Sequence, residues 1–384
     1  MDKIVYIITG DNYPNGDAGA IRSHSFAKLF QSSGYRPIVI GMGKMTNFKM
    51  EKYDDVDYYS LRYSFHNLIF KILGRVLFSL NVKRIINKSE MNKVYGIMFV
   101  SGGKSILDYI KSLSKKYNIK LFYDAVEWFS PSEFKDGKNN SLYKYNEQLN
   151  SIYIDNSFNV ISISKYFETY FKEKNINTIR IPVIMDVNKI NYNKNTNEEF
   201  IKIVYAGQMG GKDKISYFIS ALNLLSPEDL NKLRMYIIGV TLEDYEKEYG
   251  EISSKLKNHS LFFTGRISRD EVLQHLIESD FTLLLRPEDE RYAKAGFPTK
   301  VVESLSSGTP VICNYTSDLS LYLKDNYDSI IVKNFSVEAC YEALKKALSK
   351  NNQERISMQK NARKTAEENF NWINYIANFK KFIN

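Results

Sequence analysis

The sequence has very little of the chemistry that disulfide frameworks and metal sites need. It contains two cysteines, Cys313 and Cys340, among 384 residues. Two cysteines cannot form a disulfide framework or a thiolate metal site. The four histidines are scattered along the chain without ligand spacing: His24, His66, His259 and His275. We therefore expect no metal and no bound cofactor.

Long apolar runs are also missing. No uninterrupted apolar segment is long enough to cross a bilayer, and the first residues enter a strand at once without the pattern of a signal peptide. A hydrophobic content of 43% with 25% charged residues is ordinary for a soluble globular protein. We expect a cytoplasmic protein whose length is suited to two or three domains.

Acidic residues are absent from one stretch. Between Tyr58 and Ser89 there is no Asp or Glu, while Lys and Arg alternate with apolar residues over 62–88. Such a basic, apolar helix can lie on an anionic membrane surface, or it can be a packing helix whose basic face is in water. The formal net charge of +9 favours anionic partners in general, including lipid, nucleotide and nucleic acid, but no nucleic-acid module is recognised and we expect none to bind.

Predicted strands and helices alternate, and the pattern restarts halfway along the chain. This alternation favours an α/β protein of two doubly wound, Rossmann-like domains facing one cleft. We expect a first domain at 1–187, a polar linker at 188–199 and a second domain at 200–368. The end of the chain, 369–384, is predicted to be a helix with an apolar stripe.

The most informative stretch follows the predicted strand 281–285. Gly296-Phe297-Pro298 predicts a tight turn that opens a helix over 299–305, before a strand that starts at Val311. A helix N-terminus offers unpaired amides to a phosphate, and Lys300 adds a cation in the first turn. Glu303 lies on the same helical face and can accept both hydroxyls of a ribose. The stretch therefore predicts a nucleoside-diphosphate site.

These residues carry a resemblance to a known family. Gly296-Phe297, Glu303 and the segment Ser307-Gly308-Thr309-Pro310-Val311 resemble the nucleotide-sugar site of the GT-B glycosyltransferases, in the retaining branch called group 1 or family four. The first Glu of the family fingerprint is absent, because Ala295 stands there. The resemblance implies the GT-B fold, with an N-terminal acceptor-binding domain at 1–187 and a nucleotide-sugar-binding domain at 200–368. It also implies that the C-terminal helix crosses back to the N-terminal domain.

The resemblance also implies the remaining site residues. In the loop 207–214, Gln208 stands where relatives have an Arg, so Lys212, Lys214 and Arg286 become the candidate phosphate cations. In the first domain, the glycine-rich loop suggests Gly16, Gly19 and Arg22, and Glu127 could serve as a base or hydrogen-bond a sugar. The expected catalytic residues are Lys300, Glu127 and Arg286. The expected donor-binding residues are Gly16, Gly19, Gly207, Gln208, Lys212, Lys214, Arg266, Gly296, Phe297, Thr299, Lys300 and Glu303.

The resulting hypothesis is a metal-independent, retaining hexosyltransferase. It would move a sugar from a nucleoside-diphosphate donor, with UDP-sugar preferred, to a glycan or lipid-linked acceptor in bacterial surface polysaccharide or glycoconjugate synthesis. It would work in the cytoplasm, with the inner face of the plasma membrane as a candidate location. Two alternatives remain open: a catalytically silent sugar- or partner-binding subunit of the same fold, and a nucleotide-sugar epimerase.

Overall fold

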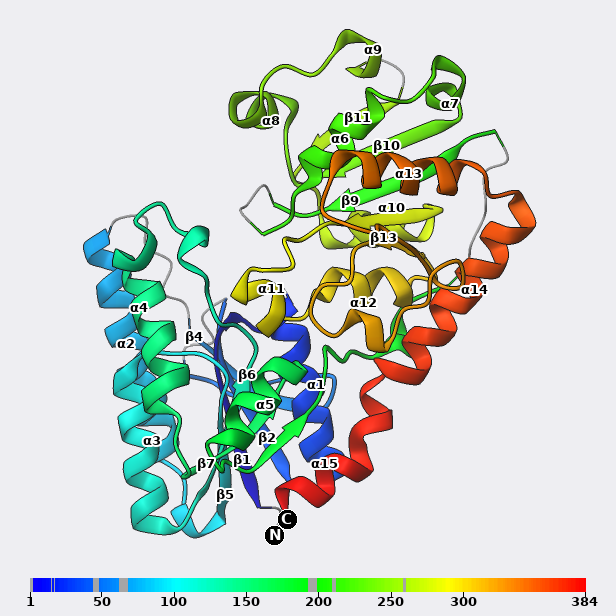
Figure 1. Ribbon diagram of the computed structural model, residues 1–384. Coiled ribbons are helices and arrows are strands. Elements are labelled where there is room, and N and C mark those ends of the chain that lie inside the picture. The colour runs from blue at the N-terminus through cyan, green and yellow to red at the C-terminus, as the bar shows by residue number, and fades with distance from the viewer. Residues whose placement is uncertain are drawn as a thin grey trace. The chain divides into compact units, whose positions relative to one another are not determined.

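The chain forms two compact units (Figure 1). The computed structural model describes residues 3–14, 16, 18–43, 48–61, 68–192, 199–208, 212–257 and 260–384, and at 68–73 it describes the backbone only. The first unit comprises Met1–Val126, Glu147–Asp186 and Asn371–Asn384, and the second comprises Glu127–Asn146 and Val187–Phe370.

The first unit is built on an eight-stranded sheet in the order β3-β4-β2-β1-β5-β6-β7-β8, in which only the β3–β4 pair is antiparallel. Its strands are β1 (Ile4–Asn12), β2 (Arg36–Met42), β3 (Glu51–Tyr53), β4 (Val56–Leu61), β5 (Val94–Phe99), β6 (Lys120–Ala125), β7 (Phe158–Ser162) and β8 (Thr178–Arg180). Its helices are α1 (Ala18–Ser32), α2 (Leu68–Asn87), α3 (Lys104–Tyr117), α5 (Lys165–Glu173) and α15 (Ile376–Ile383), with short turns at Met91–Lys93, Leu149–Tyr153 and Trp372–Tyr375.

The second unit has a six-stranded parallel sheet in the order β11-β10-β9-β12-β13-β14. Its strands are β9 (Ile201–Ala206), β10 (Leu233–Ile238), β11 (Leu261–Gly265), β12 (Phe281–Leu284), β13 (Val311–Cys313) and β14 (Ser329–Ile331). Its helices are α6 (Ile215–Leu222), α7 (Pro227–Asn231), α8 (Leu242–Tyr249), α9 (Ser254–Lys257), α10 (Arg269–Ile277), α11 (Arg291–Ala295), α12 (Thr299–Ser306), α13 (Val337–Leu348) and α14 (Asn352–Asn369), and α4 (Ser141–Gln148) spans the boundary of the two units. The prediction of two doubly wound α/β domains is confirmed.

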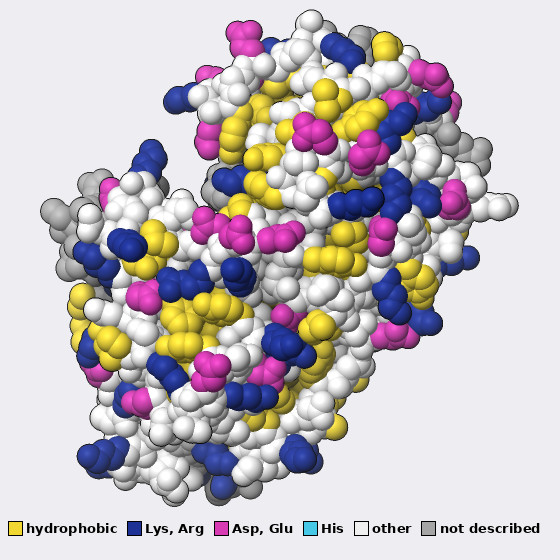
Figure 2. Space-filling model, in the orientation of Figure 1, with side chains coloured by type: hydrophobic (Ala, Val, Ile, Leu, Met, Phe, Trp, Pro, Cys, Tyr) yellow, Lys and Arg dark blue, Asp and Glu magenta, His cyan; other side chains and the backbone are white. Residues whose placement is uncertain are grey.

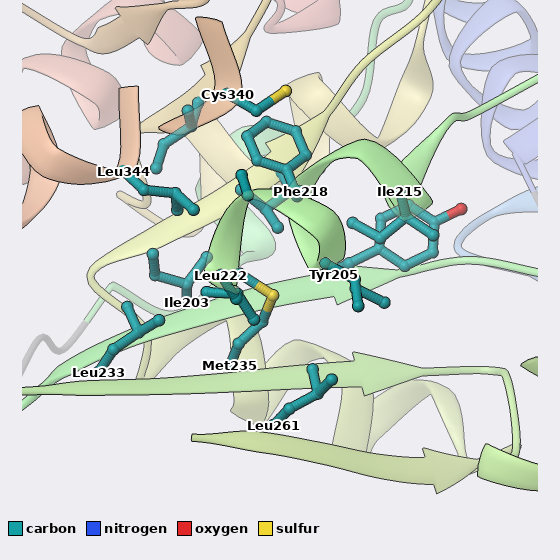
Figure 3. Close-up of a cluster of buried hydrophobic side chains, with 14 of the residues drawn as sticks. Ile203, Tyr205, Ile215, Phe218, Leu222, Leu233, Met235, Leu261, Cys340 and Leu344 are labelled. Atoms are coloured by element: carbon teal, nitrogen blue, oxygen red, sulfur yellow. The ribbon is translucent and has the colours of Figure 1, made fainter. Parts of the chain in front are cut away.

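The core of the second unit lies between one face of this sheet and helices α6 and α13. Figure 3 shows Phe218 and Leu222 of α6 and Leu344 of α13 over apolar side chains of β9, β10 and β11. Tyr205 belongs to this cluster, yet its hydroxyl lies at the margin of it. The strand β9 is therefore held rigidly up to the residue before the predicted phosphate loop.

The last helix packs on the first unit, as predicted. Phe379 of α15 lies against Phe26 and Phe30 of α1, with ring centroids 6.0 and 4.9 Å apart. The carbonyl of Ile383 accepts hydrogen bonds from the hydroxyl of Tyr95 and, at 2.7 Å, from the ammonium of Lys120. Apolar spacing alone was enough to predict this helix, because its stripe had to be buried somewhere.

The domain boundaries differ from the predicted ones in one segment. Residues 127–146 were expected in the first domain, but they pack with the second unit. The start of the predicted linker is also tied to that unit, because Arg363 Nη1 donates to the carbonyl of Ile190 at 3.0 Å. Residues 193–198 of that linker lie outside the described residues.

Charges of both signs are mixed on the surface. On the face seen in Figure 2, Lys and Arg (dark blue) lie interspersed with Asp and Glu (magenta). The net charge of +9 is therefore not gathered into one patch on that face. Within the described ranges, no helix combines the length and apolarity that crossing a bilayer requires.

Arg22 has a structural role instead of the predicted anion-binding one. Its guanidinium is buried and bound to both carboxylate oxygens of Asp124, with Nη2–Oδ1 at 2.8 Å and Nε–Oδ2 at 2.9 Å. The other guanidinium contacts are the carbonyls of Ile181 and Pro182. Burial raises the pKa of Asp124, although Arg22 opposes this shift. The pair ties α1 to the ends of β6 and β8.

Replacing Arg22 with Met should therefore destabilise the first unit strongly. The variant leaves the Asp124 carboxylate buried without its cation, which costs about 3–5 kcal/mol. Urea unfolding would show the midpoint of the first unit falling. Lys104→Met removes the exposed partner of Asp108 and should leave the midpoint unchanged. Equal midpoints for Arg22→Met and the wild type would contradict this role.

Candidate functional site

A pocket of about 350 Å³ lies at the carboxyl ends of β9, β10 and β12. β9 is the strand at which the chain order reverses, since β10 lies on one side of it and β12 on the other. Open parallel sheets bind ligands at this kind of switch point. Its walls are largely apolar, and its polar groups come from Gln208, Arg266, Lys300 and Glu303.

Two glycines let the backbone approach closely at this point. A side chain on Gly207 would meet the ammonium of Lys300 and the hydroxyl of Tyr205. Gly239 has φ +95°, and a side chain there would lie 2.5 Å from the carbonyl oxygen of Gly207. Only glycine suits both positions, so the floor of the pocket is bare backbone.

The pocket continues into a larger hollow of about 950 Å³. Gln208, Gly239 and Arg266 line both spaces. Charged side chains of both signs line the outer space: Lys135, Asp244, Lys247, Glu248 and Arg266. The two spaces together offer an apolar end and a polar end, as a ligand with a ring and charged groups would need.

Lys300 lies in a cluster of charges centred on Asp213. Its ammonium contacts Asp213 Oδ2, and Arg286 Nε donates to Asp213 Oδ1 at 2.7 Å. The hydroxyl of Tyr205 donates to Asp213 Oδ2 at 3.2 Å. Burial opposes the charge of Asp213, but the two cations hold its pKa well below the usual range. Burial also lowers the pKa of Lys300, in spite of Asp213.

Glu303 faces the pocket one turn after Lys300 on α12. Its carboxylate accepts a hydrogen bond from Arg269 Nη2 at 2.9 Å. Arg269 is the first residue of α10 and is half exposed, so the pair is open to solvent. Glu303 therefore lines the pocket with one of its oxygens bound by a neighbouring cation, and its role as the ribose acceptor stays a prediction.

α12 begins at the residue where the helix was predicted to begin. Pro298 is the N-cap residue, and the helix begins at Thr299. The amide of Gly296 donates to the carbonyl of Tyr292 and closes α11, so it is not available for a ligand. Phe297 is buried, with its ring 5.8 Å from those of Tyr322 and Phe370. The positions of Gly296 and Phe297 are structural in this unit.

Lys212, a predicted phosphate ligand, is bound to carboxylates instead. Its ammonium lies 2.7 Å from Glu127 Oε1 and 3.3 Å from Glu133 Oε1. Burial works against its charge, but the two carboxylates raise the pKa of Lys212. Glu127, a predicted base, is therefore held in an ion pair. This ion pair is one contact of residues 127–146 within the second unit.

Arg291 fixes the same segment. Its guanidinium lies over the ring of Trp128, 4.9 Å from the centroid, and donates to the carbonyl of Phe129 at 2.6 Å. The amide of Tyr292 donates to Ser130 Oγ at 3.3 Å. Residues 127–146 thus form a docked arm on α11, the helix that leads directly into the Gly296–Phe297 turn.

Five of the expected donor residues line the pocket together: Gly207, Gln208, Arg266, Lys300 and Glu303. Thr299 precedes Lys300 at the start of α12, and Lys214 caps α6 with its amide on the carbonyl of Leu285. Gly16 and Gly19 lie in the first unit around the start of α1, where a side chain would meet Asn12 and Asp11 respectively. Among the described residues, no group of three His, Cys, Asp or Glu side chains is placed to hold a metal ion.

Four important residues were missed by sequence reasoning: Tyr205, Asp213, Gly239 and Arg269. Gly239 follows β10 as Gly207 follows β9, so the repeat of a glycine after adjacent strands was a usable signal. Asp213 lies between two lysines in the loop after β9. It was missed because only the cations of this loop were considered as phosphate ligands. Nothing in the sequence pairs Arg269 with Glu303, which lies 34 positions later.

Comparison with known proteins fits this geometry. Residues 186–365 match the family described as glycosyl transferases group 1. These residues are thus similar to the domain that defines that family. An uncharacterized glycosyltransferase of Methanocaldococcus jannaschii is 24% identical over 261 residues, covering 66% of this chain and 64% of the relative. The match thus spans less than two thirds of that relative's length.

Solved structures share the fold of the whole chain. Sucrose-phosphate synthase from Thermosynechococcus elongatus superposes with a TM-score of 0.76 at 13% identity, covering 99% of this chain and 98% of that chain. HepE from Anabaena in complex with UDP-glucose superposes with a TM-score of 0.65 at 13% identity, covering 98% of each chain. The fold is GT-B, as the resemblance implied.

We expect Arg291 to be a main contact that holds residues 127–146 on α11. Replacing Arg291 with Ala removes the ring contact and the hydrogen bonds to Phe129, so residues 127–146 should exchange their amide hydrogens about tenfold faster or more. Hydrogen exchange followed by mass spectrometry would measure this. Lys294→Ala changes an exposed side chain on the same short helix and should leave exchange in the arm unchanged. Unaltered protection in Arg291→Ala would show that other contacts hold the arm.

Proposed function

We propose that this protein is a retaining glycosyltransferase that moves a sugar, a hexose in our proposal, from a nucleoside-diphosphate donor, preferably a UDP-sugar, to a glycan or lipid-linked acceptor. The observation that carries the proposal is the pocket in which Lys300 and Glu303 share one face of α12 beside the bare backbone of Gly207 and Gly239. Cation and carboxylate one turn apart suit a phosphate and a ribose. The structure of HepE with UDP-glucose supports the choice of donor class.

The residues have distinct roles in this proposal. The bond from the anomeric carbon to the diphosphate oxygen breaks, and the diphosphate leaves with the electron pair. The acceptor oxygen bonds to that carbon on the same face, and its proton passes to the leaving diphosphate. Lys300 and the amides that begin α12 stabilise the charge that develops on the diphosphate, so the transfer needs no metal ion. Glu303 holds the ribose hydroxyls.

We retain Arg286, Gln208 and Glu127 as further predicted site residues. Arg286 acts through Asp213 in this structure and Gln208 stands at the mouth of the pocket, where relatives place an Arg. Glu127 would have to leave Lys212 before it could accept a proton from a sugar hydroxyl. We propose surface polysaccharide or glycoconjugate synthesis as the setting, since lipid-linked acceptors suit the basic helix described below.

A donor screen tests the site. Thermal unfolding with UDP-, GDP-, ADP- and TDP-sugars should show stabilisation by one nucleotide class, because a ligand that binds only the folded state raises its stability. Glu303→Ala should lose most of that shift, and Lys300→Ala should lose both the shift and about 99% of the transfer rate. Product stereochemistry read by NMR would decide retention.

Matched controls are Glu338→Ala and Lys360→Ala, two exposed side chains of the same unit away from the pocket wall. Both should behave like the wild type. Donor binding without any turnover would favour the silent-subunit alternative, which Ala295 and Gln208 keep open. Conversion of the donor into its epimer without an acceptor would favour the epimerase. No stabilisation by any donor would overturn the proposed function.

We also propose that the protein works at the inner face of the plasma membrane through α2. This helix exposes Val76, Leu77 and Leu80, the last at 55%. Exposed basic side chains flank these apolar ones: Arg75, Arg84 and Lys88. Apolar groups between cations complement a bilayer that contains anionic lipid. Residues 62–67 of the predicted segment lie outside the described residues.

Vesicle binding tests this surface. The wild type should sediment with vesicles that contain phosphatidylglycerol and much less with neutral ones. Leu80→Glu should reduce the bound fraction about fivefold or more, because it puts a negative charge into the contact. Leu224→Glu alters a similarly exposed leucine of the second unit and should have no effect. Binding that ignores Leu80→Glu would exclude α2 as the contact.

A further inference from the structure

The ammonium of Lys300 is restrained from three sides. It contacts Asp213, it lies 4.5 Å from the centroid of the Tyr205 ring, and it lies where a side chain on Gly207 would be. A lysine side chain otherwise has many rotamers, and its charge is a mobile point. Lys300 is therefore held in one position although 27% of its side chain is exposed to solvent.

The carboxylate that restrains it is itself fixed. Only 7% of the Asp213 side chain is exposed, and it bonds to Arg286 and Tyr205 in addition to Lys300. The next residue, Lys214, ties the loop to the end of β12 through its amide on the carbonyl of Leu285 at 2.8 Å. Asp213 thus joins the ends of β9 and β12 to the start of α12.

Asp213 also changes the charge that a ligand meets. Two cations and one carboxylate leave the cluster with a single net positive charge. A diphosphate carries at least two negative charges, so Asp213 repels it while Lys300 and Arg286 attract it. A site with a neutral side chain at this position would bind the diphosphate more strongly, before and after transfer.

We propose that Asp213 is a positioning residue: it holds Lys300 against the diphosphate position and weakens the grip on the nucleoside-diphosphate product. The inference rests on the proposed function and deepens it. Asp213 does not touch the reacting atoms, and it acts through Lys300. Asp213 thereby has two effects: it fixes a cation for the transition state, and it lowers the affinity for the doubly charged product, which can then leave.

The holding of Lys300 can be tested without any donor. Acetylation by a dilute amine-reactive ester, followed by mass spectrometry, should label Lys300 about fivefold faster in Asp213→Asn than in the wild type, because the ammonium loses its main anchor and gives up its proton more easily. Asp213→Glu keeps the charge and should restore protection in part. Equal labelling of Lys300 in Asp213→Asn and the wild type would overturn the holding role.

The charge effect is tested by binding and rate. Calorimetry with UDP and inorganic pyrophosphate should show Asp213→Asn binding each about fivefold to tenfold tighter than the wild type. With the donor that the screen selects, kcat should fall by about tenfold or more while KM also falls. A variant that is only structurally damaged would show a higher KM, or a lower kcat with an unchanged KM. Weaker nucleotide binding in Asp213→Asn would overturn the proposal.

The pH profile gives a second readout. Asp213 and Glu303 favour the charged form of Lys300, whereas burial and Arg286 disfavour it, and the Tyr205 hydroxyl lies beside it. Activity should fall at high pH as Lys300 loses its proton, and in Asp213→Asn this fall should begin at lower pH. An identical pH dependence of activity in Asp213→Asn and the wild type would contradict the effect of Asp213 on Lys300.

A control variant and a measurement without donor distinguish failure of the proposed function from failure of the role proposed for Asp213. Asp229→Asn removes another ion-paired aspartate of the same unit, bound to Lys345 at 2.8 Å, and should change neither labelling nor binding. If the wild type binds no nucleotide and no pyrophosphate, the proposed function falls, and labelling of Lys300 still decides whether Asp213 holds it. If the wild type binds and Asp213→Asn matches it in every readout, only this inference falls.

Discussion

One buried negative charge organises the polar groups at the end of β9. Asp213 is almost fully enclosed, and burying a carboxylate costs several kcal/mol unless cations and donors compensate for it. Lys300, Arg286 and Tyr205 provide that compensation, and each comes from a different part of the second unit. The arrangement of β9, β12 and α12 around the pocket therefore depends on keeping this charge satisfied.

The same loop connects the pocket to a distant stretch of chain. Lys212 binds Glu127 and Glu133, while the neighbouring Asp213 binds Lys300. Residues 127–146 thus bind the second unit through an ion pair and through Arg291, although they follow a strand of the first unit along the chain.

The sequence departs from the family pattern at Gln208 and Ala295. Gln208 supplies no charge at the mouth of the pocket, and Lys212 is used by carboxylates. Besides Lys300, the predicted cations include Arg286, which binds Asp213, the exposed Arg266, which lines the pocket, and Lys214. Ala295 is fully buried at the end of α11, so no carboxylate lies at that position. The chemistry we propose depends on Lys300 more heavily than a site with two free cations would.

The sequence by itself determined the elements and the central motif. Apolar strands bounded by glycine and proline placed β9, β12 and β13 almost to the residue, and the turn before α12 placed Lys300 and Glu303 on one face, because these features depend on local periodicity and capping. Tertiary structure alone decided the partners of the charged residues. Arg22 with Asp124, Arg269 with Glu303, Lys212 with Glu127 and Lys300 with Asp213 are pairs separated by 34 to 102 positions, and no local rule fixes which charges meet when the chain folds. Long-range packing therefore paired Lys212 and Lys300, two predicted phosphate ligands, with carboxylates that are distant in the sequence.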